Sequence, residues 1–190
     1  MNDAIHHLSA VELEQGLSEV EASPCESGTL ISIVVRPKVN ERETLAAAKV
    51  SPEGGIEGDR WVRDSFYKLD DGRSDPRCQV SLMNARLLRQ IAGDGEGMCL
   101  AGDNLIVDFD LGEKNLPAGS QLAVGKDVVL EISDLPHTGC SKFAQRYGTE
   151  ARAHVNSERG KALHLRGRYA RVIRGGDVRI GDSITKSATE

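Results

Sequence analysis

The chain has 190 residues, of which 39% are hydrophobic and 28% are charged, and its formal net charge is −5. This composition is typical of an ordinary globular protein, and the length suits one domain with a full core better than two. No stretch approaches the roughly 18 apolar residues that a membrane span needs, and the amino-terminal residues lack the basic and apolar regions of a secretory signal. We therefore expect a cytoplasmic protein.

The hydrophobic pattern predicts many short strands and few helices. A helix is expected over residues 8–22, and a strong strand over 29–36 ends at Pro37, whereas residues 40–50 show no clear pattern. A glycine-rich loop at 51–60 and a long polar connection at 62–77 follow, and connections of that length are usually functional or disordered. A second helix is expected from Leu82 to Ile91. Further strands are predicted at 78–81, 104–109, 121–124, 128–133, 169–174 and 178–180, with a last one near Ile184.

These elements predict a mainly β fold, an antiparallel barrel-like arrangement with a few peripheral helices. The strands do not alternate regularly with helices, which excludes a doubly wound sheet. A hairpin turn is expected at Gly175-Gly176-Asp177. We divide the chain into an acidic, helical extension at residues 1–28 and a barrel domain at residues 29–190.

The turn around Cys140 is the most informative segment of the sequence. Cys140 follows an apolar, β-branched run at 128–132 and opens a short helix that Gly148 is expected to end. In the first turn of a helix, unpaired backbone N–H groups and the helix dipole stabilise negative charge. With His137 before it and Lys142 after it, the Cys140 thiol is expected to ionise and to serve as a nucleophile or metal ligand. The alternative, an inert buried cysteine, fits the polar neighbours less well.

The four cysteines are unevenly spaced and form no C-x-x-C pair, so we expect four free thiols. His137 and Cys140 do have the H-x-x-C spacing of metal ligands. A structural zinc site needs four ligands, however, and no second pair is visible. Zinc binding is therefore the weaker interpretation.

Basic residues gather in the carboxy-terminal part of the chain. Residues 1–30 hold six acids and no Lys or Arg, whereas residues 135–175 hold nine Lys or Arg and two acids, Glu150 and Glu158. Such an asymmetry most commonly reflects a solvated charged face, and its functional interpretation is a pocket for a small anion such as phosphate. Nucleic acid fits less well, because the chain is acidic and no aromatic platform lies among the basic residues.

Several short motifs occur in an order that resembles the MOSC family, named for the C-terminal domain of molybdenum cofactor sulfurases. The resemblance spans roughly residues 29–186, and Cys140 stands where the family keeps its key residue. The chain differs from many members at two places, because Trp61 replaces a histidine and Cys140 follows His-Thr-Gly instead of proline. The motifs lie at residues 55–60, 80–84, 101–105, 116–125, 130–133, 136–148 and 175–182.

The resemblance implies a barrel-like fold with the cysteine at the edge of a cleft, and a protein that handles sulfur or molybdenum cofactor. The cysteine would carry a persulfide or ligate molybdenum, so the activity would be sulfur transfer or the reduction of N-hydroxylated compounds. The chain is too short for the pyridoxal-phosphate domain of the large sulfurases. A cysteine desulfurase or another sulfur donor is therefore the expected partner, beside a molybdoenzyme or an electron-donor protein. No nucleic acid or membrane partner is expected.

Ten residues are the candidates for this site. Cys140 and His137 are the candidate catalytic residues; Cys140 is also the candidate molybdenum ligand, and His137 would hold a proton or bond to the sulfur. Arg166 and Arg168, which would share a face of one strand, are candidates for a pterin phosphate together with Lys142. Each assignment has a structural alternative. His137 would be a surface histidine, Asp59 and Arg60 would form a structural pair, and Arg166 and Arg168 would be exposed charges that keep a sheet edge soluble. The remaining candidates for cofactor binding are Asp59, Arg60, Asn104, Thr138 and Gly139.

A competing hypothesis is a non-catalytic module that holds a small anionic, phosphate-bearing ligand in the basic cleft. It predicts that Arg166 and Arg168 are required for binding and that Cys140 is dispensable. A simple thiol redox protein is a third possibility. The absence of a nearby resolving cysteine in the sequence disfavours it, although Cys78 is a candidate neighbour in space.

Overall fold

A closed barrel of seven strands forms the centre of the computed structural model, which describes residues 5–187. Strand β1 (Ser27–Val35) pairs with β11 (Ser183–Ser187) to close the barrel, with Gly28 opposite Ile184. The short strand β2 (Glu43–Leu45) extends the sheet beyond β1. In spatial order the barrel strands are β11 (Ser183–Ser187), β7 (Gln121–Val124), β8 (Val128–Ile132), β9 (Arg168–Arg174), β5 (Val80–Asn84), β6 (Leu105–Asp108) and β1 (Ser27–Val35).

The mainly β, barrel-like prediction is confirmed, but the barrel is mixed and not antiparallel throughout. Strands β5 and β6 run parallel, with Leu82 opposite Leu105. Parallel neighbours need a crossover connection, and helices α3 (Ala85–Ala92) and α4 (Glu96–Cys99) supply it. The predicted helix from Leu82 therefore begins three residues later. Leu82 belongs to β5, and the Asn84 side chain caps α3 by accepting from the Arg86 and Leu87 N–H groups.

A second sheet of three strands covers one end of the barrel. It consists of β10 (Gly176–Arg179), β3 (Ala47–Ser51) and β4 (Gly55–Ile56), so the patternless stretch at 40–50 forms strands. The predicted hairpin at Gly175-Gly176-Asp177 is wrong, because β10 pairs with β3 and not with β9. Both glycines serve close packing instead. A Cβ on Gly175 would lie 2.6 Å from the Val50 carbonyl oxygen.

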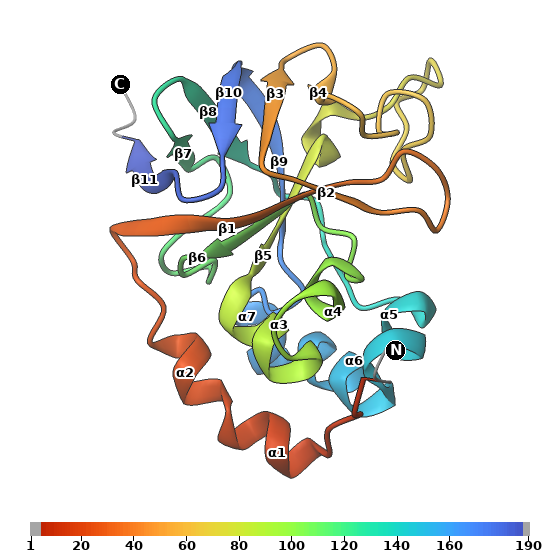
Figure 1. Ribbon diagram of the computed structural model, residues 1–190, viewed down its shortest axis with the longest axis vertical. Helices are drawn as coiled ribbons and strands as arrows, with labels where there is room; N and C mark the ends of the chain where they lie inside the picture. Colours follow the sequence, from red (N-terminus) through yellow and green to blue (C-terminus); the bar gives the residue numbers. More distant parts are fainter. Residues whose placement is uncertain (1–4, 188–190) are drawn as a thin grey trace.

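The helices gather on the side of the molecule that faces away from this second sheet (Figure 1). The predicted helix at 8–22 is interrupted at Gly16, where a Cβ would lie 2.1 Å from the Gln90 side chain. Helices α6 and α7 were not expected from the sequence. Besides α3 and α4, the described helices are α1 (Ala10–Gln15), α2 (Leu17–Glu21), α5 (Ser141–Tyr147), α6 (Thr149–Asn156), α7 (Glu158–Ala162) and the 3₁₀ turn η1 (Pro76–Cys78).

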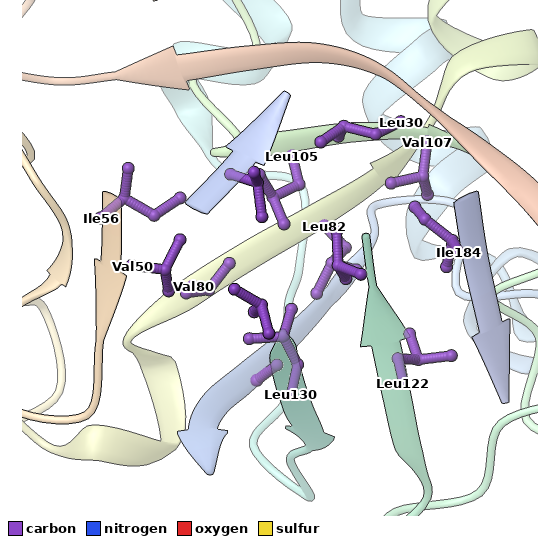
Figure 2. Close-up of a cluster of buried hydrophobic side chains, with 14 of the residues drawn as sticks. Leu30, Val50, Ile56, Val80, Leu82, Leu105, Val107, Leu122, Leu130 and Ile184 are labelled. Carbon is purple, nitrogen blue, oxygen red and sulfur yellow. The ribbon is translucent and has the colours of Figure 1, made fainter. Parts of the chain in front are cut away.

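Two hydrophobic clusters stabilise this arrangement. One fills the barrel with aliphatic side chains such as Leu82, Leu105 and Leu130 (Figure 2). The other joins the outside of the barrel to the helices, and it includes Leu13 and Leu17 of the amino-terminal helices. The predicted extension thus packs onto the helical layer, although residues 1–4 and 188–190, the outer ends of the two predicted segments, lie outside the described residues. Within residues 5–187, no helix is long and apolar enough to cross a membrane.

Candidate functional site

A pocket of about 260 Å³ opens beside Cys140, between loops that are far apart in the sequence. Its walls come from the β1–β2 connection, the 60–67 loop, the turn before β6 and the turn that leads into α5. Within the described chain, Asp103 is the one carboxylate of the lining. The lining also contains seven cationic residues: Arg36, Lys38, Arg42, Arg60, Lys142, Arg146 and Arg166.

Three of these cations leave the pocket with uncompensated positive charge. Arg36, Lys38, Arg60 and Arg166 each pair with a carboxylate. By contrast, no carboxylate among residues 5–187 lies within ion-pair distance of Arg42, Lys142 or Arg146. A concave surface with such an excess of guanidinium and ammonium groups favours a multiply charged anion.

Cys140 is exposed at this pocket and occupies the N-cap position of α5, one residue before the first helical turn in which it was predicted. Partial burial opposes ionisation of its thiol. The backbone N–H groups of Phe143 and Lys142 and the charge of Arg166 outweigh that effect, so the pKa of Cys140 lies below its ordinary value. The thiol is therefore both accessible and predisposed to ionise.

The other three cysteines are free thiols as well, which confirms that prediction, but their surroundings differ. Cys25 is exposed, and burial followed by the charge of Asp110 raises the pKa of its thiol. Cys78 is buried and donates to the Asp75 carbonyl oxygen at 3.2 Å. Cys99 is partly buried. Cys140 is thus the exposed thiol whose environment favours the thiolate.

His137 lies in the pocket wall beside two buried ionic groups. Its ring stacks on Tyr169 at a centroid distance of 4.1 Å, and its Nδ1 lies 3.7 Å from Oδ1 of Asp103. Arg166 donates to the other oxygen of Asp103 at 2.7 Å. The pKa of His137 lies well below its usual value, because burial disfavours the charged ring and the Arg166 and Arg36 charges repel it. The imidazole is therefore neutral at pH 7.

Asp59 and Asn104 lie behind the pocket wall and position Arg36. Asp59 accepts from Arg36 Nε at 2.8 Å and Nη2 at 3.0 Å, and Asn104 accepts from Nη2 at 3.1 Å. Asn104 also donates to Asp59 at 3.0 Å, which closes the network. The bidentate Asp59–Arg36 pair fixes the guanidinium plane at the pocket surface.

Residues 73–185 match the model of the MOSC domain. The chain belongs to the MOSC domain family. Solved structures show the same fold. Similar chains are the YuaD protein from Bacillus subtilis (TM-score 0.56, 18% identity, 86% of this chain and 97% of that one) and YiiM from Geobacillus stearothermophilus (TM-score 0.57, 17% identity, 84% and 75%). YiiM from Escherichia coli is also similar (TM-score 0.52, 18% identity, 85% and 71%). No curated protein matches the chain.

In this MOSC domain the pocket brings together six of the ten predicted site residues. Cys140, His137, Thr138, Arg60, Lys142 and Arg166 line it. Asp59 and Asn104 support it from behind. The two others are outside the lining. The Gly139 N–H donates to the side-chain oxygen of Asn156, and Arg168 donates to Glu113 at 2.9 Å.

The expectation that Arg166 and Arg168 share a face is wrong. Strand β9 begins at Arg168, so Arg166 precedes it, and Gly167 between them has φ of +96°. That left-handed conformation sends the two side chains in different directions. Arg166 contacts Asp103 in the pocket, whereas Arg168 is buried against Glu113 and the Ser133 carbonyl oxygen.

Sequence reasoning missed much of the pocket wall of this MOSC domain. Arg36, Lys38 and Arg42 come from the connection after β1, where the distribution of charge along the sequence did not indicate a basic site. The long polar connection at 62–77 was expected to be functional or disordered, and it supplies Phe66 and Tyr67. Tyr67 donates to the Pro136 carbonyl oxygen at 3.0 Å and so ties this loop to the Cys140 turn. Arg146 and Tyr169 complete the set of missed residues.

The donor set of the pocket is poor in side chains that bind metals directly. Within residues 5–187, no three His, Cys, Asp or Glu side chains are grouped as metal ligands. The pocket does offer one accessible sulfur at Cys140 and many cations. This combination suits an anionic cofactor that brings its own metal ligands and takes one thiolate from the protein.

Proposed function

We propose that this MOSC protein handles sulfur or molybdenum cofactor through the thiolate of Cys140, while the surrounding cations hold a phosphate-bearing ligand. One observation carries the proposal: an accessible thiol of lowered pKa opens into a pocket lined by seven cationic residues and one carboxylate. Such a setting stabilises the deprotonated sulfur that both persulfide formation and metal ligation require.

The residues of the pocket fit the pterin form of molybdenum cofactor. Arg42, Lys142 and Arg146, which lack carboxylate partners within residues 5–187, would hold its phosphate, and Cys140 would ligate its metal. When bound, the cofactor supplies two-electron redox chemistry. The chain itself supplies the charge that neutralises the phosphate, the Arg36 guanidinium fixed by Asp59, and an aromatic wall that contains Tyr67 and Tyr169.

The same thiolate supports sulfur transfer without any change in the pocket. The Cys140 sulfur would attack the outer sulfur of a persulfide on a donor protein, such as a cysteine desulfurase. The new S–S bond would form as the donor's own S–S bond breaks, and the donor cysteine would leave as a thiolate. The backbone N–H groups at the start of α5 and the charge of Arg166 would then stabilise the Cys140 persulfide anion.

The excess of cations also supports a second candidate, a module that only binds a small phosphate-bearing ligand. In that case the positive charge of Arg42 and Arg146 binds the ligand, and Cys140 does not contribute to binding. The two candidates differ in one requirement. Binding that depends on the arginines but not on the thiol favours the module.

Intact mass and metal content of protein made in a host that synthesises molybdenum cofactor test the proposal. Molybdenum and pterin that are present in the wild type and lost in Cys140→Ser support cofactor ligation. A mass gain of one sulfur after treatment with a cysteine desulfurase, lost in the same variant, supports the sulfur carrier. Cys25→Ser is the matched control, because it removes an exposed thiol outside the pocket. If neither the metal nor the sulfur depends on Cys140, the proposal is overturned.

A further inference from the structure

Three side chains form a buried polar chain in the wall of the pocket. The exposed fractions of Arg166, Asp103 and His137 are 9%, 1% and 8%. Arg166 Nη1 donates to Asp103 Oδ2 at 2.7 Å, and the second carboxylate oxygen, Oδ1, faces His137 Nδ1 at 3.7 Å. Arg166 is itself fixed over the Phe143 ring, 5.1 Å from its centroid. The carboxylate is therefore held in place from one side.

In the part of the protein that the structure describes, three atoms of this chain lack the partners that buried polar atoms normally have: Nε of Arg166 and one atom each of Asp103 and His137. Within residues 5–187, Oδ1 of Asp103 and Nδ1 of His137 are sealed from solvent and make no hydrogen bond. A buried acceptor without a partner has lost its hydration and gained nothing in return, so native proteins seldom keep one without a reason. The Asp103 and His137 atoms face each other across a gap slightly longer than a hydrogen bond. A hydrogen on Nδ1 would satisfy both of them, whereas a lone pair there would face the carboxylate's own lone pairs.

We propose that Asp103 is a positioning residue that keeps the hydrogen of the neutral His137 ring on Nδ1, so that Nε2 presents its lone pair to the pocket. Because Nδ1 is sealed, the ring lines the pocket through its other edge, which carries Nε2. Stacking on Tyr169 holds the plane of the ring. Arg166 orients the carboxylate, the carboxylate orients the imidazole, and the imidazole acts on the ligand.

This arrangement gives the pocket a hydrogen-bond acceptor among donors. Arginine and lysine side chains only donate, so they cannot recognise a ligand group that carries a hydrogen. Nε2 of His137 would accept from a thiol, a hydroxyl or a protonated phosphate oxygen close to Cys140. The identity of that ligand group rests on the proposed function. The position of the hydrogen on the His137 ring does not depend on it.

The ¹⁵N chemical shifts of the histidine ring, measured on the full chain without metal at pH 7, test the position of the hydrogen. Protonated and unprotonated ring nitrogens resonate far apart, and His137→Gln assigns the signals. We expect His137 to show a protonated Nδ1 and an unprotonated Nε2. A wild-type ring protonated on Nε2, or on both nitrogens, overturns the proposal without any further variant.

Asp103→Asn then tests whether the carboxylate sets this state. The carboxamide oxygen can still accept from Arg166, which turns the amino group toward His137, so the unprotonated resonance should move from Nε2 to Nδ1. Asp75→Asn is the matched control, since Asp75 is also buried and paired with an arginine but lies outside the pocket. If both variants leave the histidine signals unchanged, Asp103 has no positioning role. Since no step involves Cys140 or molybdenum, failure here leaves the proposed function standing, and the reverse also holds.

Discussion

Cys140 and Cys25 are both exposed thiols, but their surroundings shift their pKa values in opposite directions. Backbone N–H groups and Arg166 lower the pKa of Cys140 against the effect of partial burial, whereas burial and Asp110 raise that of Cys25. Because only the thiolate is alkylated, iodoacetamide at pH 7 should modify Cys140 several-fold faster. Peptide mass spectrometry over a series of times measures both rates in one sample.

Two variants show whether the difference arises from the pocket. Cys25→Ser should leave the rate at Cys140 unchanged. Arg166→Gln removes one of the charges that favour the thiolate, so the pH at which Cys140 is half-alkylated should rise. A faster reaction at Cys25 in the wild type would contradict the assignment of Cys140 as the reactive thiol.

Asp59 shows how a predicted site residue can act one layer behind the ligand. Burial raises the pKa of its carboxyl, but the hydrogen bonds and charge of Arg36 outweigh burial, so the folded pKa lies below the ordinary 3.8. A carboxylate with a lowered folded pKa stabilises the fold fully above 3.8, and this contribution is lost as the pH falls through the folded value. Asp59→Asn, which leaves Arg36 without its partner, should cost about 3 kcal/mol at pH 7.

Urea unfolding at several pH values measures this cost. The difference between the wild type and Asp59→Asn should shrink as the pH falls below 3.8, because the unfolded carboxyl then takes up its proton. It should be lost once the pH falls below the folded pKa, where the carboxyl is neutral in both states. Asp64→Asn is the control, since Asp64 pairs with Arg60 but is 60% exposed, and its loss should cost less than about 1 kcal/mol. A constant difference across the whole pH range would show that charge is not what Asp59 contributes.

At the scale of elements, Gly167 forms the turn between Arg166 in the pocket wall and the start of strand β9. Its φ is +96°, and a Cβ at this position would lie 2.1 Å from the Leu82 carbonyl oxygen in β5. Gly119 has a similar φ of +88°, but a Cβ there would meet nothing within 4 Å. Gly119→Ala should therefore cost about 1 kcal/mol from backbone strain alone.

Gly167→Ala should cost at least about 3 kcal/mol, because the clash with β5 adds to the strain. The displaced chain should also carry Arg166 away from Asp103. Thermal unfolding of both variants measures the two costs. If both variants lost the same stability, strand β5 would have shifted at Leu82 to accommodate the Cβ, and the glycine would be needed only for its backbone angles.

The amino-terminal helices are held mainly by apolar burial. Leu17 of α2 is 1% exposed within the helical cluster, whereas Arg159 of α7, which pairs with Glu14 and Glu21, is 53% exposed. Leu17→Ala should cost about 2–4 kcal/mol. Arg159→Ala should cost less than about 1 kcal/mol, because exposed ion pairs contribute little. Urea unfolding compares them, and the opposite order would show that the helices dock by charge.

Sequence patterns predicted elements best where local rules decide. The strands at β1, β6, β7 and β8 follow apolar runs bounded by turn residues, and their positions were nearly correct. Short strands such as β3 and β4 show no such pattern, because their stability depends on pairing, of β3 with β10 and of β4 with β3. The glycines at the start of β10 resemble a hairpin in the sequence, and only their close neighbours in the structure, the Val50 backbone and the Asp127 side chain, show that they serve packing.

At the scale of the whole molecule, the site could be predicted only in part. The Cys140 turn is local, so the strand before it and the short helix after it could be predicted from the sequence. Arg36 and Arg42, by contrast, reach the pocket because closure of the barrel brings the β1–β2 connection beside the α5 turn. No rule of spacing connects residues about a hundred positions apart. Of the nine basic residues in the carboxy-terminal part, Lys142, Arg146 and Arg166 line the pocket, whereas the other four cations of the lining come from earlier in the chain.

A basic pocket on a chain with net charge −5 predicts selective stabilisation by small anions. Inorganic phosphate at tenfold its dissociation constant should stabilise the fold by about 1.4 kcal/mol, and so raise the melting temperature by about 3–6 °C. Sodium chloride at equal ionic strength should not, because chloride screens the cations without bridging them. Arg146→Gln should weaken the effect of phosphate, whereas Arg179→Gln, an equal change of charge outside the pocket, should leave it intact. If both variants respond alike, phosphate acts on the overall charge of the molecule and not on a site.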